Sequence, residues 1–144
     1  MAIQNVNVVN AAASPVLARN LDNSARQPFQ QVLMSDPQFP AAPQSFVVPG
    51  GKCLVIEYVS GYVTMPQGQK VSDLALQTTV GNVTAAHRMS VALMTTGVND
   101  RFITCQLLCA YASPGTTVAF SVGGSGAGPI STILTLSGHL VDVP

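Results

Sequence analysis

Hydrophobic and polar residues alternate over several short stretches in the last two thirds of the chain. Between residues 101 and 112 the odd positions carry Ile103, Cys105, Leu107, Cys109 and Tyr111, and the even positions are mixed. A period of two is typical of β-strands, because successive side chains point to opposite faces of a sheet. Similar patterns predict strands over residues 46–48, 53–64, 71–80, 83–94, 101–112, 117–122 and 131–143.

Turn-forming residues separate these stretches at intervals of about ten residues. Gly81-Asn82, between two strand patterns, is typical of a tight hairpin. No segment has a convincing helical period, and residues 15–26, the nearest to one, lack an apolar stripe. We therefore expect an all-β fold, an antiparallel β-sandwich of jelly-roll type with an extended N-terminal arm.

Two of the predicted strands carry apolar residues on both faces. In 53–64 Val55, Val59 and Val63 alternate with Leu54, Ile56, Tyr58 and Tyr62, and 131–143 shows a similar pattern. A strand with one buried face needs apolar residues only at every second position. The pattern therefore predicts a second covered surface, shielded by the N-terminal arm or by a neighbouring subunit.

The region before residue 46 has a different composition. Six of the ten prolines lie in residues 11–49, and residues 36–44 cannot form a central strand, because proline lacks the backbone N–H donor. We divide the chain into an extended arm and linker over 1–45, with a short strand allowed at 28–34, and a β-sandwich domain over 46–144. The aromatic residues Phe29 and Phe39 indicate that the arm lies on an apolar surface, which makes them candidate subunit contacts.

Residues 5–10, Asn-Val-Asn-Val-Val-Asn, have a strand-like pattern and no hairpin partner nearby. Their backbone groups need hydrogen-bond partners, which an edge of the same domain or of a neighbouring subunit can supply; a loose terminus is the third alternative. The long connector makes exchange between subunits geometrically easy. We expect Val6, Val8 and Val9 to contact a second copy in a closed trimer or a filament.

The composition favours association. Charged residues make up 8% of the chain and the net charge is zero, so little repulsion opposes contact between copies. We expect a homo-oligomer at an extracellular or cell-surface location. Six scattered Lys and Arg residues argue against nucleic-acid binding, and no apolar run is long enough to span a membrane. The first ten residues lack the basic and apolar regions of a signal peptide.

The residues that could carry chemistry are few and scattered. The chain has two histidines, three cysteines and six acidic residues, without the spacing of a metal site or a catalytic triad. We expect no catalytic residues, no metal and no cofactor. Glu57 is expected to pair with Lys52, Lys70 or Arg88, His87 to be a satisfied core or interface residue, and His139 to be exposed or in a subunit contact. The cysteines are expected to be buried thiols that act as small hydrophobic residues, with a disulfide from Cys53 to Cys105 or Cys109 as the alternative.

One loop offers an alternative function. Asn99, Asp100 and Arg101 precede Phe102, and planar polar groups beside an aromatic ring are common in sugar-binding loops. Asn and Asp are also ordinary turn residues, and the chain lacks tryptophan, the usual stacking platform. A carbohydrate-binding module with a glycan partner is therefore the alternative to a structural subunit.

Three segments carry a family resemblance. The Asn/Val-rich start, residues 48–61 (VPGGKCLVIEYVSG) and residues 137–144 (SGHLVDVP) resemble uncharacterised bacterial proteins in which Asn/Val-rich repeats precede a small β domain. The likeness covers roughly residues 45–144. It implies a β-sandwich, and it implies no activity and no functional residues.

Overall fold

The computed structural model describes residues 26–143, and all regular elements in this range are β-strands. The strands are β1 (Arg26–Ser35), β2 (Ser45–Val47), β3 (Lys52–Pro66), β4 (Val71–Val80), β5 (Val83–Arg88), β6 (Ala92–Thr95), β7 (Asn99–Ala112), β8 (Thr117–Gly124) and β9 (Ser131–Asp142). No helix in this range could cross a membrane. The predicted all-β class is confirmed.

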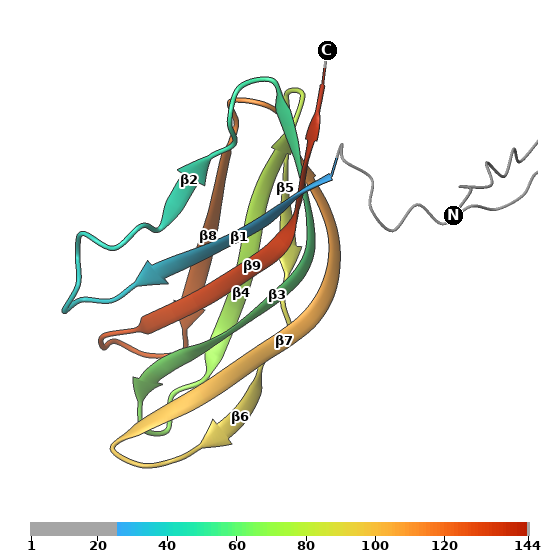
Figure 1. Ribbon diagram of the computed structural model, residues 1–144. Coiled ribbons are helices and arrows are strands. Elements are labelled where there is room, and N and C mark those ends of the chain that lie inside the picture. Colours follow the sequence, from blue (N-terminus) through green and yellow to red (C-terminus); the bar gives the residue numbers. More distant parts are fainter. Residues whose placement is uncertain (1–25, 144) are drawn as a thin grey trace, which may run out of the picture.

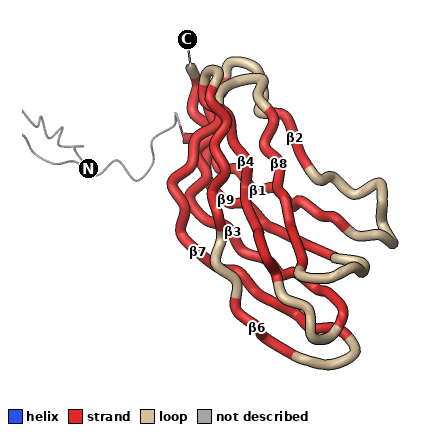
Figure 2. The backbone as a smooth tube through the Cα atoms, turned by 180° about the vertical axis from the view of Figure 1, so that it is seen from behind, coloured by secondary structure: helices blue, strands red, loops and turns tan. Residues whose placement is uncertain are grey.

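The strands form two antiparallel sheets. One sheet has five strands in the order β1-β9-β3-β7-β6, and the other has four in the order β2-β8-β4-β5. Figure 1 shows the long strands of the first sheet lying in front of β8, β4 and β5, and Figure 2 gives the same arrangement from behind. Neighbouring strands in space come from distant parts of the sequence, as in β9, which pairs with both β1 and β3.

One hydrophobic cluster contains buried residues of both sheets. Its fully buried members include Leu33, Leu54, Ile56, Leu76, Val118, Leu134 and Leu136. These residues come from β1, β3, β4, β8 and β9, so the core does not belong to any one hairpin. The alternation predicted for 131–143 is confirmed for Leu134 and Leu136, which face the core.

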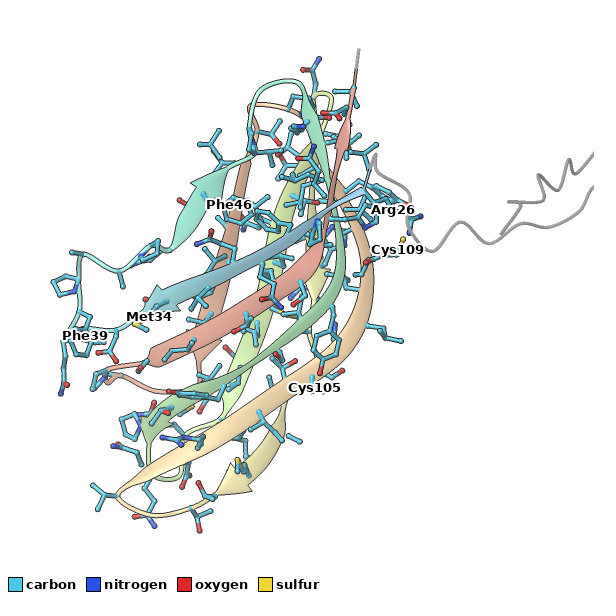
Figure 3. All side chains as sticks on the ribbon, in the orientation of Figure 1. Arg26, Met34, Phe39, Phe46, Cys105 and Cys109 are labelled. Carbon is cyan, nitrogen blue, oxygen red and sulfur yellow. The ribbon has the colours of Figure 1, made fainter. Side chains whose placement is uncertain are left out.

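Residues 26–35 of the segment expected as an arm are a strand of the five-stranded sheet. β1 pairs with β9 over its whole length, from Arg26 opposite Val141 to Ser35 opposite Thr132. Phe29 contacts Phe46 at a ring-centroid distance of 5.3 Å, and Phe39 lies in an exposed turn, 61% accessible. Phe29 thus has a partner within its own chain, whereas Phe39 points to the surface (Figure 3).

A β-bulge accounts for much of the two-sided apolar pattern of 53–64. The register of β3 against both β7 and β9 shifts between Ile56 and Tyr58. Leu54 and Ile56 are buried before the shift, and Val59 and Val63 are buried after it. Even and odd residues thus face the core in succession, so a single covered face explains most of this strand.

The single strand predicted over 83–94 is wrong: two strands lie there, in different sheets. β5 pairs with β4, and β6 pairs with β7. Between them Met89 is buried, and its backbone N–H donates to the carbonyl of Leu74. The chain crosses from one sheet to the other here while its apolar alternation continues, which is how two-sheet folds form corners.

Candidate functional site: an open flank beside β7

In the described part of the chain, β7 has a long strand edge without a partner strand, and β1, at the other end of the same sheet, also has no strand beyond it. On one side β7 pairs with β3 along its length, whereas β6 pairs with it only at Arg101, Phe102 and Ile103. Within the described residues 26–143, Thr104–Ala112 has no strand on its other side. Such an edge presents backbone donors and acceptors to any extended chain of suitable length.

The composition of this edge does little to discourage pairing, although a register shift against β3 lies at Leu108–Cys109 and the Ser90 backbone N–H donates to the Gln106 side chain. Protein edges are commonly guarded by charged residues, proline or bulges. Residues 102–112 contain neither a charged residue nor proline, and their burial alternates regularly along most of the strand. Leu107, at the middle of the edge, is 85% exposed.

The inner face of β5 is uncovered next to this edge. Val83 pairs with Val80, Ala85 with Thr78, and His87 with Leu76, so the three β5 side chains share the face of the buried Thr78 and Leu76. Nevertheless Val83 is 70% exposed and Val80 51% exposed, and Ala85 is also exposed. The five-stranded sheet therefore does not extend over β5.

The free edge of β7 and the uncovered inner face of β5 are adjacent. At its end β7 reaches β4, because the backbone N–H of Ser113 donates to the carbonyl of Thr79. Since β5 is the next strand after β4, a strand added to the free edge of β7 would lie over β5. We call this place the open flank: the edge of Thr104–Ala112 together with Val80, Val83, Ala85 and His87.

His87 is the one imidazole of the open flank. Its Nε2 lies 2.9 Å from the hydroxyl oxygen of Thr78, and its side chain is partly buried. The neighbouring Arg88 is an ion-pair partner of Asp73. The expectation of a hydrogen-bonded histidine at a core or interface position agrees with its position, whereas interface contact itself stays a prediction.

Asn99, Asp100 and Arg101, which were expected in a loop, begin strand β7 and do not form one cluster. Asn99 and Arg101 line a hollow with Tyr62, and the Arg101 guanidinium lies 4.6 Å from the centre of the Tyr62 ring. Asp100 is buried, and its carboxylate accepts a hydrogen bond from the Gly68 backbone N–H at 2.8 Å. The structure thus brings two of the three predicted ligand residues together.

Asp36 completes the polar side of this hollow. The Ser131 hydroxyl donates to one carboxylate oxygen at 2.7 Å, and the Gln38 backbone N–H donates to the other at 2.8 Å. These two donors stabilise the charged form and hold the pKa of Asp36 below its usual value. The hollow therefore offers a carboxylate and a guanidinium to a polar ligand.

Glu57, at the bulge of β3, has a partner that the sequence did not indicate. Its Oε2 lies 3.4 Å from Nδ1 of His139, and the predicted pairing with Lys52, Lys70 or Arg88 is wrong. Lys52 pairs instead with Asp142 and Arg88 with Asp73. His139 is 7% exposed, so the expectation of an exposed side chain is also wrong. The two residues come from β3 and β9, so their proximity depends on strand order.

The predicted N-terminal contact residues Val6, Val8 and Val9 lie outside the described residues. The first described residue, Arg26, lines a hollow together with Cys109 and Tyr111 of β7. Figure 3 shows Arg26 and Cys109 at the same end of the domain. The start of β1 therefore lies at the same end of the sheet as Cys109 and Tyr111, with β9 and β3 between β1 and β7.

Among residues 26–143, no three His, Cys, Asp or Glu side chains are arranged to hold a metal ion. Cys105 and Cys109 are exposed and Cys53 is partly exposed, so the expectation of buried thiols is wrong; all three are free, so the alternative disulfide is not formed either.

Comparison with known proteins yields no match: no family model, curated protein or solved structure corresponds to the chain. The resemblance to bacterial β domains stays an expectation.

Proposed function

We propose that this protein is a structural subunit that assembles with copies of itself, as a trimer or a filament, by N-terminal strand exchange. Residues 5–10 of one copy pair with the free edge of β7 in the next copy. The observation that carries the proposal is the open flank, where a free strand edge lies beside an uncovered apolar face. Strand addition satisfies such an edge and covers such a face in one step.

The dimensions of donor and acceptor agree. Nine residues of β7 present an edge of roughly 30 Å, and the six donor residues extend over roughly 20 Å. Val6 and Val8 share one face of the donor strand, so in the proposed register they cover Val83 and Ala85. Asn5 and Asn7 then face solvent. In this proposal, the apolar sheet face that joins the copies is the inner face of β5.

The shape of the open flank favours a single extended segment over a whole domain. Because β6 pairs with the start of β7, a neighbouring sheet with long strands approaching this edge would meet β6. A lone strand avoids this obstacle. Whether exchange closes into a ring or continues as a fibre depends on the rotation between copies.

The fold within this proposal is a jelly-roll sandwich. The chain moves between the sheets after β1, β2, β3, β5, β7 and β8. These repeated crossings, with four strands in each sheet and β6 as an addition to the first sheet, support two interlocked Greek keys. Low charge and zero net charge support an extracellular or cell-surface location for the assembled particle.

Size-exclusion chromatography with light scattering tests the proposal. The full chain is expected to run as an oligomer, and a form lacking residues 1–24 as a single subunit. This deletion ends before β1, so both sheets remain intact. Within the full chain, Val8→Asp is expected to weaken assembly because it places a charge over β5, whereas Asn7→Asp, on the solvent side, is the matched control.

Two results would reject exchange. One is a full chain that runs as a single subunit. The other is an oligomer whose mass is the same with and without residues 1–24, because another surface must then hold it together.

Carbohydrate binding is the second candidate function, and the hollow of Asn99, Arg101, Tyr62 and Asp36 supports it. The guanidinium of Arg101 already covers the Tyr62 ring, which reduces the room for sugar stacking. A glycan array with the full chain and with Arg101→Ala tests this candidate. Binding that disappears in the variant would support it, and silence across the array would reject it.

A further inference from the structure

A hollow lined by residues of both sheets lies at the end of the domain where β7 begins. It has a volume of about 370 Å³, and its walls come from the turn after β3, the start of β4, β6 and β7. Figure 1 shows the turn after β3 and the β6–β7 hairpin at this same lower end. The hollow is separate from the one that Arg101 lines, because Asp100 and Arg101 point to opposite faces of β7.

Asp100 is the buried acid of this hollow. It is 5% exposed and shares the inner face of β7 with Phe102. Its Oδ2 accepts the hydrogen bond from the Gly68 backbone N–H, whereas its Oδ1 has neither a donor nor an ion-pair partner within residues 26–143. A buried carboxylate oxygen without a donor costs free energy, so the site favours a ligand that brings one.

Gln69 adds a second acceptor to the same wall. Its Nε2 donates to the carbonyl of Ala127 at 3.0 Å, which sets the direction of the side-chain amide. Its Oε1 is buried and, like Oδ1 of Asp100, has no donor in the part of the chain that the structure describes. Because neither oxygen has appreciable exposed surface, a ligand head group would reach them only from within the hollow.

The other walls of the hollow are largely apolar. Val71, Val91 and Leu93 line it together with the Phe102 ring. Leu93 is 53% exposed, so part of this apolar surface is open to solvent. A hydrocarbon chain lying against these side chains would leave water, which favours binding.

We propose that this hollow is a binding site for primary alkylammonium compounds. The ammonium group donates to Oδ1 of Asp100 and to Oε1 of Gln69, and the alkyl chain lies along the apolar wall. An ammonium group has three N–H donors and no acceptor, so it brings no unmet acceptor of its own. Its hydrogen bond to the carboxylate is charge-assisted, because a primary amine is protonated at neutral pH.

Other cations match the two oxygens less well. A guanidinium binds best to both oxygens of one carboxylate, and Oδ2 of Asp100 already accepts from Gly68. Calcium and magnesium take more oxygen ligands than these two. A competitor exists within the chain: Lys70 also lines the hollow, is exposed, and forms no ion pair with any residue in 26–143.

Saturation-transfer NMR with the full chain tests the proposal. Hexylammonium is the probe, and 1-hexanol is the uncharged control of the same length. Hexylammonium is expected to bind saturably and roughly tenfold more tightly than 1-hexanol. Asp100→Asn should abolish this difference, because asparagine can still accept from Gly68 but carries no charge. Asp142→Asn, which removes an exposed acid paired with Lys52, is the matched control and should leave the affinity unchanged.

Three outcomes would overturn the proposal. The first is a full chain that binds hexylammonium no more tightly than 1-hexanol, a comparison that requires no variant. The second is an unchanged affinity in folded Asp100→Asn. The third is hexylammonium binding that appears only in Lys70→Gln, because the ammonium of Lys70 would then fill the site itself. The hollow includes neither the open flank nor residues 1–24, so a failure of strand exchange does not alter these criteria.

Discussion

Gly138 and Glu57 show how single residues shape the five-stranded sheet. Gly138 lies opposite Ile56, next to the bulge, and a methyl group built on it would overlap the carbonyl oxygen of Val55. Glu57, on the other side of the register shift, meets His139. These roles depend on the distance between two strands far apart in sequence. Sequence patterns could therefore indicate the strands and not these contacts.

Replacement of Gly138 by alanine should destabilise the sheet. The added methyl group must displace the backbone of β3, and overpacking of this kind costs about 1–3 kcal/mol in the free energy of unfolding. Urea denaturation measures the loss. Gly50→Ala is the control, because no atom lies within 4 Å of the methyl position there. Equal stability of the two variants would contradict the close approach of β3 and β9.

At the scale of the strands, the alternation of apolar and polar residues indicated where the strands lie better than it indicated which strands pair. The patterns over 71–80, 101–112 and 131–143 correspond to β4, β7 and β9 within two residues. The crossing at Met89 escaped prediction, because the apolar period continues through it. The open flank escaped prediction for a related reason: β7 has the pattern of an ordinary half-buried strand, and the short reach of β6 appears only in the pairing.

The two faces of β5 allow a sharp test of the open flank. Ala85 shares the inner face with Val83, and Ala86 points the opposite way; both are exposed. In the full chain Ala85→Asp should shift the light-scattering mass toward the single subunit, because a charge would lie under the donated strand. Ala86→Asp should leave the mass unchanged.

Both aspartates should have little effect on the unfolding temperature of the form lacking residues 1–24, since each site is exposed there. Loss of assembly in both variants, or in neither, would place the contact between copies away from the inner face of β5.

At the scale of the whole molecule, the small number of charges decides what kind of assembly is available. The chain carries six basic and six acidic residues, and the ion pairs Lys52–Asp142 and Arg88–Asp73 lie within one copy. In the proposed assembly, contact between copies would then depend mainly on backbone hydrogen bonds and apolar burial. This expectation follows from composition, whereas the proposed location of the contact comes from the pairing of the strands.

Assembly should accordingly be insensitive to salt. Screening weakens interactions between exposed charges and has little effect on strand pairing. The light-scattering mass of the full chain is expected to be the same at low and at high sodium chloride concentration. Dissociation at high salt would indicate that charged groups hold the copies together.

The pairing of Arg26 with Val141 gives the molecule a direction. The chain enters β1 and leaves β9 at the same pole, while the turn that carries Phe39 lies at the far pole (Figure 3). Copies joined head to tail would therefore all point the same way, and a fibre built from them would have two unlike tips. Growth could then proceed at one tip faster than at the other, and a label fused beyond Val143 would mark the same pole of every copy.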